Sequence, residues 1–538
     1  RIYGEHFFGW DGGIAVTRDM GTPTDPELYA YAVCGREENV TLYGLRKAER
    51  GVEIAKIPAE IQMPREPIHI GISAAVYNGL AVVSMPVDNK LVFIDTKERK
   101  QIGTASVPSV RGVHFDSKGN LFVICGNALK RFQIADLQKP QLGEEKTLIS
   151  TGLEAPNSLT SDDAGNLYIA DWGKAHQVKV FDAAGKALRT IGKPGGKQLG
   201  LYDEERMHHP QGLTIDDTGR IWIAEADSLP KRISVWNADS GKFEMAKYGP
   251  PHYGGGGTID PTDPTRAFYA EFGGLMEFAL DWKTGTSKLK AIVSRQDMQG
   301  LIGIPGENWW PERAVHLGGR TYLVGNYQGG LRGNTNTAIF LLDDKTRIAR
   351  PVAYVGSDRW WPSVAKDPAM KETMPGKKNE HFLTWSDLNN DGNPQPDEMK
   401  YRIFDEKFTD AKGEQRTTFG YREFYPQPDL SMVGVWGIHV PAPKIREDGV
   451  PIYDLIQAKF LLPPGTAPTY EGSEDGELLM PAPDGTLLTS DKGYKDGRLA
   501  WSYPGRNDYK DVARGPGDMN VATRALGPVM KAPAGEAG

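Results

Sequence analysis

This sequence has almost no cysteine: Cys34 and Cys125 are the only two among 538 residues. Two thiols exclude a scaffold held together by disulfides, and this low usage fits either the cytosol or the periplasm. Both lie in apolar stretches, "YAVCG" and "FVICG", which predicts buried strand residues rather than a disulfide. No apolar run reaches the roughly 18 residues that a membrane helix needs, so we expect no membrane span.

Basic stripes and segments with helical periodicity are also lacking. The net charge is −7, and phosphate binding needs clustered Lys and Arg, so the sequence argues against a nucleic-acid partner. Glycine and proline are abundant instead, with 63 and 38 residues. This excess predicts many turns between short elements.

One pattern recurs along the chain. Its copies are "RGVHFDSKGNLFVICGNALKRFQI" from Arg111, "PNSLTSDDAGNLYIADWGKAHQVKVFDAAGKALRTIG" from Pro156 and "PQGLTIDDTGRIWIAEADSLPKRISVWNADSGKFEMAKYG" from Pro210. Each copy shows an apolar strand ending in Asp, a Gly turn and three further strands. The turn glycines Gly119, Gly165 and Gly219 are 46 and 54 residues apart. Four-stranded units at this spacing predict a β-propeller.

These units resemble the repeats of NHL-type propellers, whose Pro-x-Gly-Leu-x-x-Asp-x-x-Gly-Asn consensus is visible at 156–171 and 210–225. We therefore expect an all-β fold with seven or eight four-stranded blades over 1–505, clearest over about 110–250. Residues 357–430 are expected to form an insertion or blade with a calcium loop, and 506–538 an extension or linker.

The stretch "SDLNNDGNPQPDE" carries the ligand spacing of an EF-hand loop. Oxygen-bearing residues occupy every ligand position, and Gly392 fills the sixth, where a sharp turn is needed. The predicted ligands are Asp387, Asn389, Asp391, Asn393, Gln395 and Glu398. The flanks "HFLTW" and "MKYRIF" indicate strands instead of helices, so we expect a structural Ca²⁺ and not a calcium sensor. An Asx-rich turn without metal is the plainer alternative.

Aligning neighbouring repeats on Asp216 and Asp260 places two pairs of residues at equivalent positions just before the innermost strand. These pairs are His208 with His252, and His209 with Tyr253. Imidazole and phenol groups suit proton transfer. Several secreted polysaccharide lyases are propellers with His and Tyr in such roles, and this chain is similar to them in architecture and chemistry. Arg206 is the candidate cation for a uronate carboxylate.

Other side chains are candidates for sugar binding. Arg111, Asn157 and Gln211 occupy equivalent repeat positions and are expected to face the channel mouth, where they bind hydroxyls. Trp172, Trp309, Trp310 and Tyr327 are candidates for stacking on sugar rings, with blade packing as the alternative role.

Three functions therefore remain open. The preferred one is a secreted or periplasmic, carbohydrate-active propeller with lyase chemistry. The second is a non-catalytic platform that binds glycan or protein. The third is a lactonase or lyase acting on small molecules with a transition metal on the axis, held by residues among His69, His114, His209 and His316. Strand alternation argues against His114 and His209 sharing one metal.

Overall fold

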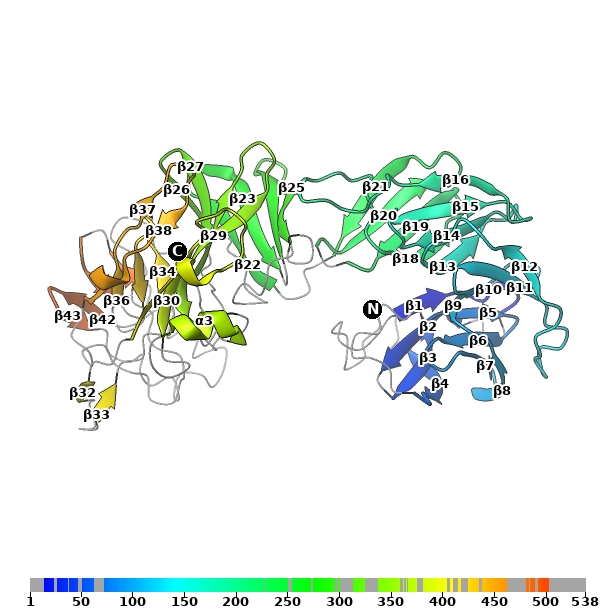
Figure 1. Ribbon diagram of the computed structural model, residues 1–538. Helices are drawn as coiled ribbons and strands as arrows, with labels where there is room; N and C mark the ends of the chain where they lie inside the picture. Colours follow the sequence, from blue (N-terminus) through cyan, green and yellow to red (C-terminus); the bar gives the residue numbers. More distant parts are fainter. Residues whose placement is uncertain are drawn as a thin grey trace. The chain divides into compact units, whose positions relative to one another are not determined.

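A computed structural model (Figure 1) gives the fold. It describes residues 14–23, 27–36, 38–46, 51–61, 72–227, 229–249, 254–271, 274–295, 299, 313–324, 337–358, 361, 364, 366–374, 381–403, 407–409, 415–417, 424–434, 438–461, 480–482, 484–488 and 492–502. The chain divides into two compact units. Unit 1 comprises residues 1–198 and 203–252, and unit 2 comprises 199–202 and 253–538.

Unit 1 holds five antiparallel sheets of four strands, each built from strands that follow one another in the chain. The strands are β1 (Ile14–Thr17), β2 (Leu28–Arg36), β3 (Asn39–Arg46) and β4 (Val52–Pro58); β5 (Ala74–Tyr77), β6 (Leu80–Met85), β7 (Lys90–Asp95) and β8 (Lys100–Ser106); β9 (Val110–Phe115), β10 (Leu121–Cys125), β11 (Ala128–Phe132) and β12 (Lys146–Ile149); β13 (Pro156–Ser161), β14 (Leu167–Asp171), β15 (Gln177–Phe181) and β16 (Ala187–Ile191); and β18 (Pro210–Ile215), β19 (Arg220–Glu225), β20 (Arg232–Asn237) and β21 (Phe243–Tyr248).

Unit 2 is also built from antiparallel sheets. Its strands are β17 (Gly200–Leu201) with β22 (Gly254–Asp260), β23 (Asp263–Glu271), β24 (Gly274–Asp281) and β25 (Thr286–Arg295); β26 (Arg313–Leu317), β27 (Arg320–Val324), β28 (Thr337–Leu342), β29 (Ala349–Ser357), β30 (Phe382–Ser386) and β31 (Met399–Arg402); β32 (Lys407–Thr409) and β33 (Gln415–Thr417); β34 (Phe424–Pro426), β35 (Met432–Gly434), β36 (Ile438–Val440) and β39 (Lys459–Phe460); β37 (Lys444–Ile445) and β38 (Pro451–Ile452); and β40 (Met480–Pro481), β41 (Leu487–Leu488), β42 (Lys492–Lys495) and β43 (Arg498–Ser502). Short helices are α3 (Pro368–Thr373), η3 (Pro396–Glu398) and η5 (Leu455–Gln457).

The sheets within unit 1 pack as the blades of a propeller do. The first strands β1, β5, β9, β13 and β18 lie side by side in that order (Figure 1). Buried apolar clusters fill the space between consecutive sheets: Val33 packs with Val83, and Tyr168 with Ile221. Burying one such side chain contributes about 2 kcal/mol. The alternating apolar residues of each repeat lie on the faces of its sheet, and these faces are buried against the neighbouring sheets.

The Asp that follows each of the first strands β9, β13 and β18 organises the turn that comes next. Asp116, Asp162 and Asp216 each accept the backbone N–H of the residue four positions later, together with a nitrogen of its side chain. Gly119, Gly165 and Gly219 have φ of 80°, 87° and 74°, which glycine adopts without steric cost. The Asp and Gly of the repeat are therefore turn residues and not ligand-binding ones.

The all-β, propeller-like fold expected from the sequence is confirmed. The described residues contain nine sheets of at least four strands, where seven or eight blades were expected. That residues 1–505 form one propeller stays a prediction. Cys34 and Cys125 lie on β2 and β10, half-buried where full burial was expected. Within the described part of the chain, no helix is long and apolar enough to cross a membrane.

Candidate functional site: the rim of unit 1

The candidate site lies where the first strands of unit 1 begin. Three of these strands, β9, β13 and β18, carry one extra residue against their partners. The extra residue falls between Val110 and Val113 in β9, at Asn157 in β13 and at Gln211 in β18. A β-bulge of this kind re-aims a side chain and is frequent next to binding sites. Arg111, Asn157 and Gln211, which the sequence predicted to be equivalent, therefore share one local geometry.

The residue before each bulged strand also follows a rule. The carbonyls of Ser109, Ala155 and His209 each accept the backbone N–H of the residue that follows the second strand. Ser109 and His209 both have left-handed backbones, with φ of 54° and 47°. His209 therefore shares its left-handed backbone with Ser109, although Ala155 at the same repeat position does not have one. The imidazole of His209 is what distinguishes it.

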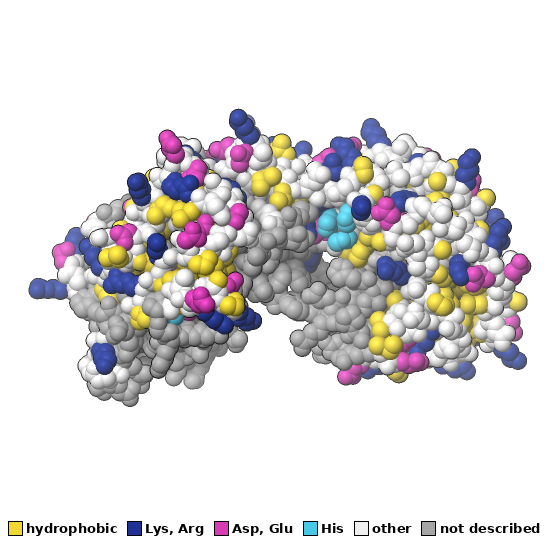
Figure 2. All heavy atoms as spheres, in the orientation of Figure 1, with side chains coloured by type: hydrophobic (Ala, Val, Ile, Leu, Met, Phe, Trp, Pro, Cys, Tyr) yellow, Lys and Arg dark blue, Asp and Glu magenta, His cyan; other side chains and the backbone are white. Residues whose placement is uncertain are grey.

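Three histidines gather at this rim. His208 and His209 precede β18, and His176 lies in the turn between β14 and β15. The ring centroid of His176 is 4.6 Å from that of His208 and 4.8 Å from that of His209. The ring centroids of His208 and His209 are 4.2 Å apart. Figure 2 shows histidine side chains grouped at the surface (cyan). We call His176, His208 and His209 the histidine cluster.

One hydrogen bond within the cluster assigns the tautomer of the neutral His176 ring. The backbone N–H of His209 donates to Nδ1 of His176 at 3.2 Å. A nitrogen that accepts cannot carry a proton, so the neutral His176 ring holds its proton on Nε2. His176 is a member of the site that the repeat alignment missed, because it lies in a turn 32 residues before His208.

Trp172 borders the cluster but is engaged by the fold. Its ring centroid is 4.5 Å from that of His209, and its Nε1 donates to the carbonyl of Pro210 at 2.7 Å. The indole therefore joins the sheet of β13–β16 to that of β18–β21. This contact supports the packing role of Trp172, while stacking on a sugar ring stays a prediction.

A buried group of four charges lies beneath the cluster. We call Lys197, Glu225, Asp227 and Arg232 the buried quartet; each side chain is at most 3% exposed. Lys197 Nζ is 3.0 Å from Glu225 Oε2 and 2.9 Å from Asp227 Oδ2, and Arg232 Nε is 2.5 Å from Glu225 Oε1. The two positive and two negative charges balance, which buried charges require.

The buried quartet holds the backbone that carries the histidines. Glu225 Oε2 accepts the N–H of His208 at 2.9 Å. The Arg232 guanidinium donates to the carbonyls of Glu204 and Arg206 at 2.9 and 3.0 Å. Gly196 packs against the rings, since a Cβ there would lie 2.9 Å from Cδ2 of His176. The rings are thus positioned by buried groups.

The two arginines predicted at the rim differ in their surroundings. Arg206 donates through Nη1 to the carbonyl of Pro194 at 2.5 Å and lies 3.6 Å from Asp203. Arg111 is half-exposed, and among the described residues it makes neither a hydrogen bond nor an ion pair. Of these two cations, Arg111 is the one left for a ligand. The role predicted for Arg206 stays a prediction.

Several predicted residues lie outside the described residues, namely His69, His252, Tyr253, Trp309, Trp310 and Tyr327. Their roles stay predictions.

The axial metal finds no support in the described part of the chain. There, no group of three or more His, Cys, Asp or Glu side chains is arranged to hold a metal ion. His114 Nε2 is 2.9 Å from Ser161 Oγ, and burial lowers the pKa of His114 to about 4. In unit 2, His316 Nε2 is 2.8 Å from Asp260 Oδ1. Both rings are held by neighbouring side chains.

The predicted calcium loop connects β30 to β31, two strands that extend the outer edge of a sheet in unit 2. The strand flanks expected from the sequence are confirmed. Gly392 has φ of 73°, as the sharp turn requires. Asp387 is fully buried, and this burial raises its pKa, although Gly392 N–H and Arg350 act in the opposite direction.

Some of the oxygen atoms in the loop are placed as ligands of a hard cation, whereas the Glu398 carboxylate is not. Asp387 Oδ1, Asn393 Oδ1 and Gln395 Oε1 are buried oxygens without a hydrogen bond from any described residue. Glu398 is different, because its carboxylate accepts the backbone N–H groups of Leu388 and Gln395 at 2.6 and 3.2 Å. The carboxylates of the loop accordingly do not converge. Two of these oxygens, on Asp387 and Gln395, stand at ligand positions 1 and 9, where a Ca²⁺ would satisfy them; position 7 ligates through its backbone carbonyl instead.

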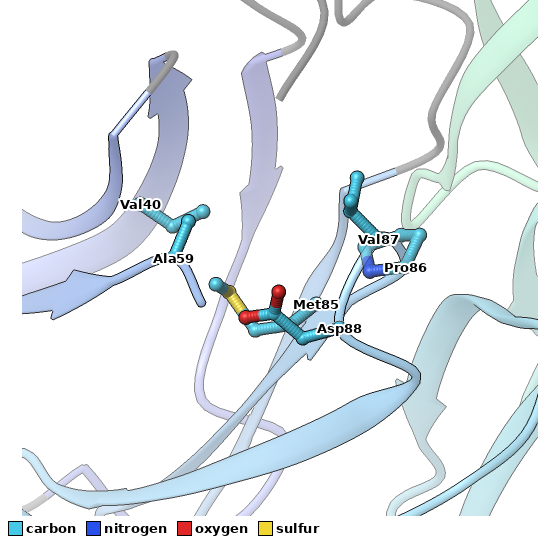
Figure 3. Close-up of a pocket in the computed structure, with 6 residues that line it drawn as sticks. All are labelled: Val40, Ala59, Met85, Pro86, Val87 and Asp88. Atoms are coloured by element: carbon cyan, nitrogen blue, oxygen red, sulfur yellow. The ribbon is translucent and has the colours of Figure 1, made fainter. Parts of the chain in front are cut away.

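A hollow of about 170 Å³ elsewhere in unit 1 is too small for a binding pocket (Figure 3). Val40, Ala59, Met85, Pro86, Val87 and Asp88 line it. Asp88 already accepts the backbone N–H groups of Glu60 and Ile61. The rim therefore remains the better candidate.

Comparisons with known proteins do not identify a family. No family model and no curated protein matches the chain. Matching solved structures include Kuenenia stuttgartiensis hydrazine synthase, which is 15% identical over 51% of this chain and 77% of that chain, with a TM-score of 0.27. A protein of unknown function from Bacteroides caccae is 14% identical over 47% of this chain and 90% of that chain, with a TM-score of 0.30. A chain of a nidogen–laminin complex is 14% identical over 53% of this chain and 96% of that chain, with a TM-score of 0.32. At these values they carry no conclusion about function.

Proposed function

We propose that this chain is a secreted or periplasmic carbohydrate-active protein that performs lyase-type acid–base chemistry at the rim of unit 1. The observation that carries the proposal is the histidine cluster, in which three imidazoles touch at the start of β18. Imidazole exchanges protons near neutral pH, and a site with several rings can hold one neutral and one protonated.

The reaction we propose is β-elimination from a uronic acid. A neutral imidazole of His208 or His209 removes the proton on C5, the electron pair forms the C4–C5 double bond, and the C4–O bond breaks. A separate group, acting as the acid, protonates the departing oxygen. The one of His208 and His209 that does not act as base is one candidate for this acid when its ring is protonated; His176 is not, because its Nδ1 accepts the backbone N–H of His209 and loss of its Nε2 proton would leave an imidazolate. Tyr253 is the other candidate named from the sequence.

The test is an assay of unsaturated uronic-acid product on a panel of uronate polymers. Replacement of His209 by Asn, a residue that tolerates the left-handed backbone, should lower the rate roughly 100-fold or more. His208→Gln should have a similar effect. His439→Gln in unit 2 is the matched control and should keep the wild-type rate. Turnover that survives both rim substitutions would contradict the proposal.

A binding platform is the second candidate function. It needs a ligand-binding rim but no proton transfer, and the half-exposed Arg111, which pairs with no described residue, would serve it. Glycan binding without product from any polymer would support this candidate over the lyase.

We also infer that the loop 387–398 binds a structural Ca²⁺. Asp387 and Gln395 would supply unmet buried side-chain oxygens, and Asn393 its backbone carbonyl. The ion would hold the hairpin of β30 and β31 together from its turn and would take no part in the reaction.

A further inference from the structure

We propose that Arg111 forms a carboxylate-binding subsite at the bulge of β9, so that the ligand of the rim is an acidic sugar. This inference rests on the proposed function and names the residue that binds the carboxylate of its substrate. It also moves the carboxylate-binding role from Arg206, where the sequence placed it, to Arg111.

The first support is the state of the two guanidinium groups. Arg206 is held by the carbonyl of Pro194. Arg111 is only half-exposed, yet within the described part of the chain it has no hydrogen-bond acceptor and no carboxylate. A partly desolvated guanidinium without a counter-charge is unfavourable, and a bound carboxylate removes that cost through two parallel N–H···O bonds.

The second support is the neighbour across the sheets. β9 and β13 approach so closely that a Cβ on Gly112 would lie 2.6 Å from the carbonyl oxygen of Asn157. Asn157 is 2% exposed, and its Nδ2 donates to no described residue. A buried amide donor without an acceptor costs about 1–3 kcal/mol. A small rotation toward an oxygen bound beside Arg111 would satisfy it.

The third support is the position of the histidine cluster. β13 lies between β9 and β18, and Trp172 from the sheet of β13 reaches Pro210 at the start of β18. Arg111, Asn157, Gln211 and His209 are therefore arranged along one rim in repeat order. A carboxylate at one end with proton-transfer groups at the other suits a uronate oligomer spanning adjacent sugars.

The experiment is calorimetric titration with oligogalacturonate and with its methyl ester, which has the same shape without the charge. The acid should bind, and the ester should bind about 10- to 100-fold more weakly. Arg111→Gln should reduce binding of the acid to the level of the ester, while Arg111→Lys should lie between. Arg131→Gln, which removes another half-exposed arginine from the same sheet, should leave both affinities unchanged.

Equal binding of acid and ester, or unchanged binding by Arg111→Gln, would overturn the subsite. Loss of acid binding in Arg206→Gln alone would overturn it in favour of Arg206. These outcomes leave the proposed function standing if product still forms. If neither oligomer binds, the subsite is wrong, and the product assay on the other polymers then decides the proposed function separately.

Discussion

The backbone N–H of His208 donates to Oε2 of Glu225, a carboxylate that is fully buried between Lys197 and Arg232. Asp171, at the end of the corresponding strand β14, accepts the N–H groups of Glu154 and Ala155. An acidic residue at this point thus holds the segment that precedes a first strand. At β18 that segment carries two histidines.

Breaking the buried quartet should therefore cost stability. Glu225→Gln leaves Arg232 without its carboxylate partner and Lys197 with Asp227 alone, which should lower the free energy of unfolding by about 3–5 kcal/mol. Urea denaturation measures the change. Glu205→Gln, an exposed carboxylate that pairs with Lys193, should change it by less than about 1 kcal/mol. If the two substitutions have equal effects, the quartet does not hold the rim.

The pKa of His114 predicts an acid-sensitive fold. Burial lowers this pKa from 6.5 to about 4. Between these values the unfolded chain binds a proton that the folded chain does not, so stability falls as the pH is lowered from about 6.5 to about 4. The loss should total roughly 3 kcal/mol. His114→Gln has no titrating ring and should lose less stability over the same range. Parallel pH profiles for both proteins would contradict the burial of a neutral His114.

Backbone contact between β9 and β13 gives a prediction with a matched control. A Cβ on Gly112 would lie 2.9 Å from Cα of Ser158, whereas one on Gly212, at the equivalent repeat position, meets only the Ala224 side chain at 3.4 Å. Gly112→Ala should therefore destabilise the protein by about 1–3 kcal/mol, and Gly212→Ala should be nearly neutral. Thermal unfolding of both variants checks this. Equal effects would mean that the two strands do not approach closely at the bulge.

Calcium should raise the melting temperature. A ligand present at 100 times its dissociation constant stabilises the folded state by about 2.7 kcal/mol. Asp387→Asn replaces the buried carboxylate at the first ligand position by a neutral amide and should abolish this stabilisation. Asp397→Asn removes an exposed charge of the same loop outside the ligand positions and should preserve it. The loop is an Asx-rich turn without metal if the wild type gains no stability from Ca²⁺ over Mg²⁺.

Much of the fold was predictable because the residues that form the turns are part of the repeat sequence. The Asp and Gly of each first turn, together with strands that alternate in polarity, are local signals. They placed Arg111, Asn157 and Gln211 at equivalent positions, and the register confirms this. The bulge itself was not predictable, because it follows from pairing with the second strand and not from the composition of the first.

The site was predictable only in part. Repeat alignment found His208 and His209, but His176 lies in a turn with no equivalent in the repeat register. Lys197 shows the same limit, since no local pattern indicates that a lysine in "PGGKQ" will be buried beside Glu225. Such contacts depend on how adjacent sheets bring their turns together, which repeat spacing does not specify.

The central claim is that the rim of unit 1 binds an acidic sugar beside the histidine cluster. It is tested most directly by NMR of the imidazole nitrogens in protein labelled with ¹⁵N-histidine, during titration with oligogalacturonate. Among the 10 histidines, the account predicts saturable shifts at His176, His208 and His209, lost in Arg111→Gln. Binding that leaves these three resonances unmoved, or shifts that persist in Arg111→Gln, would contradict it.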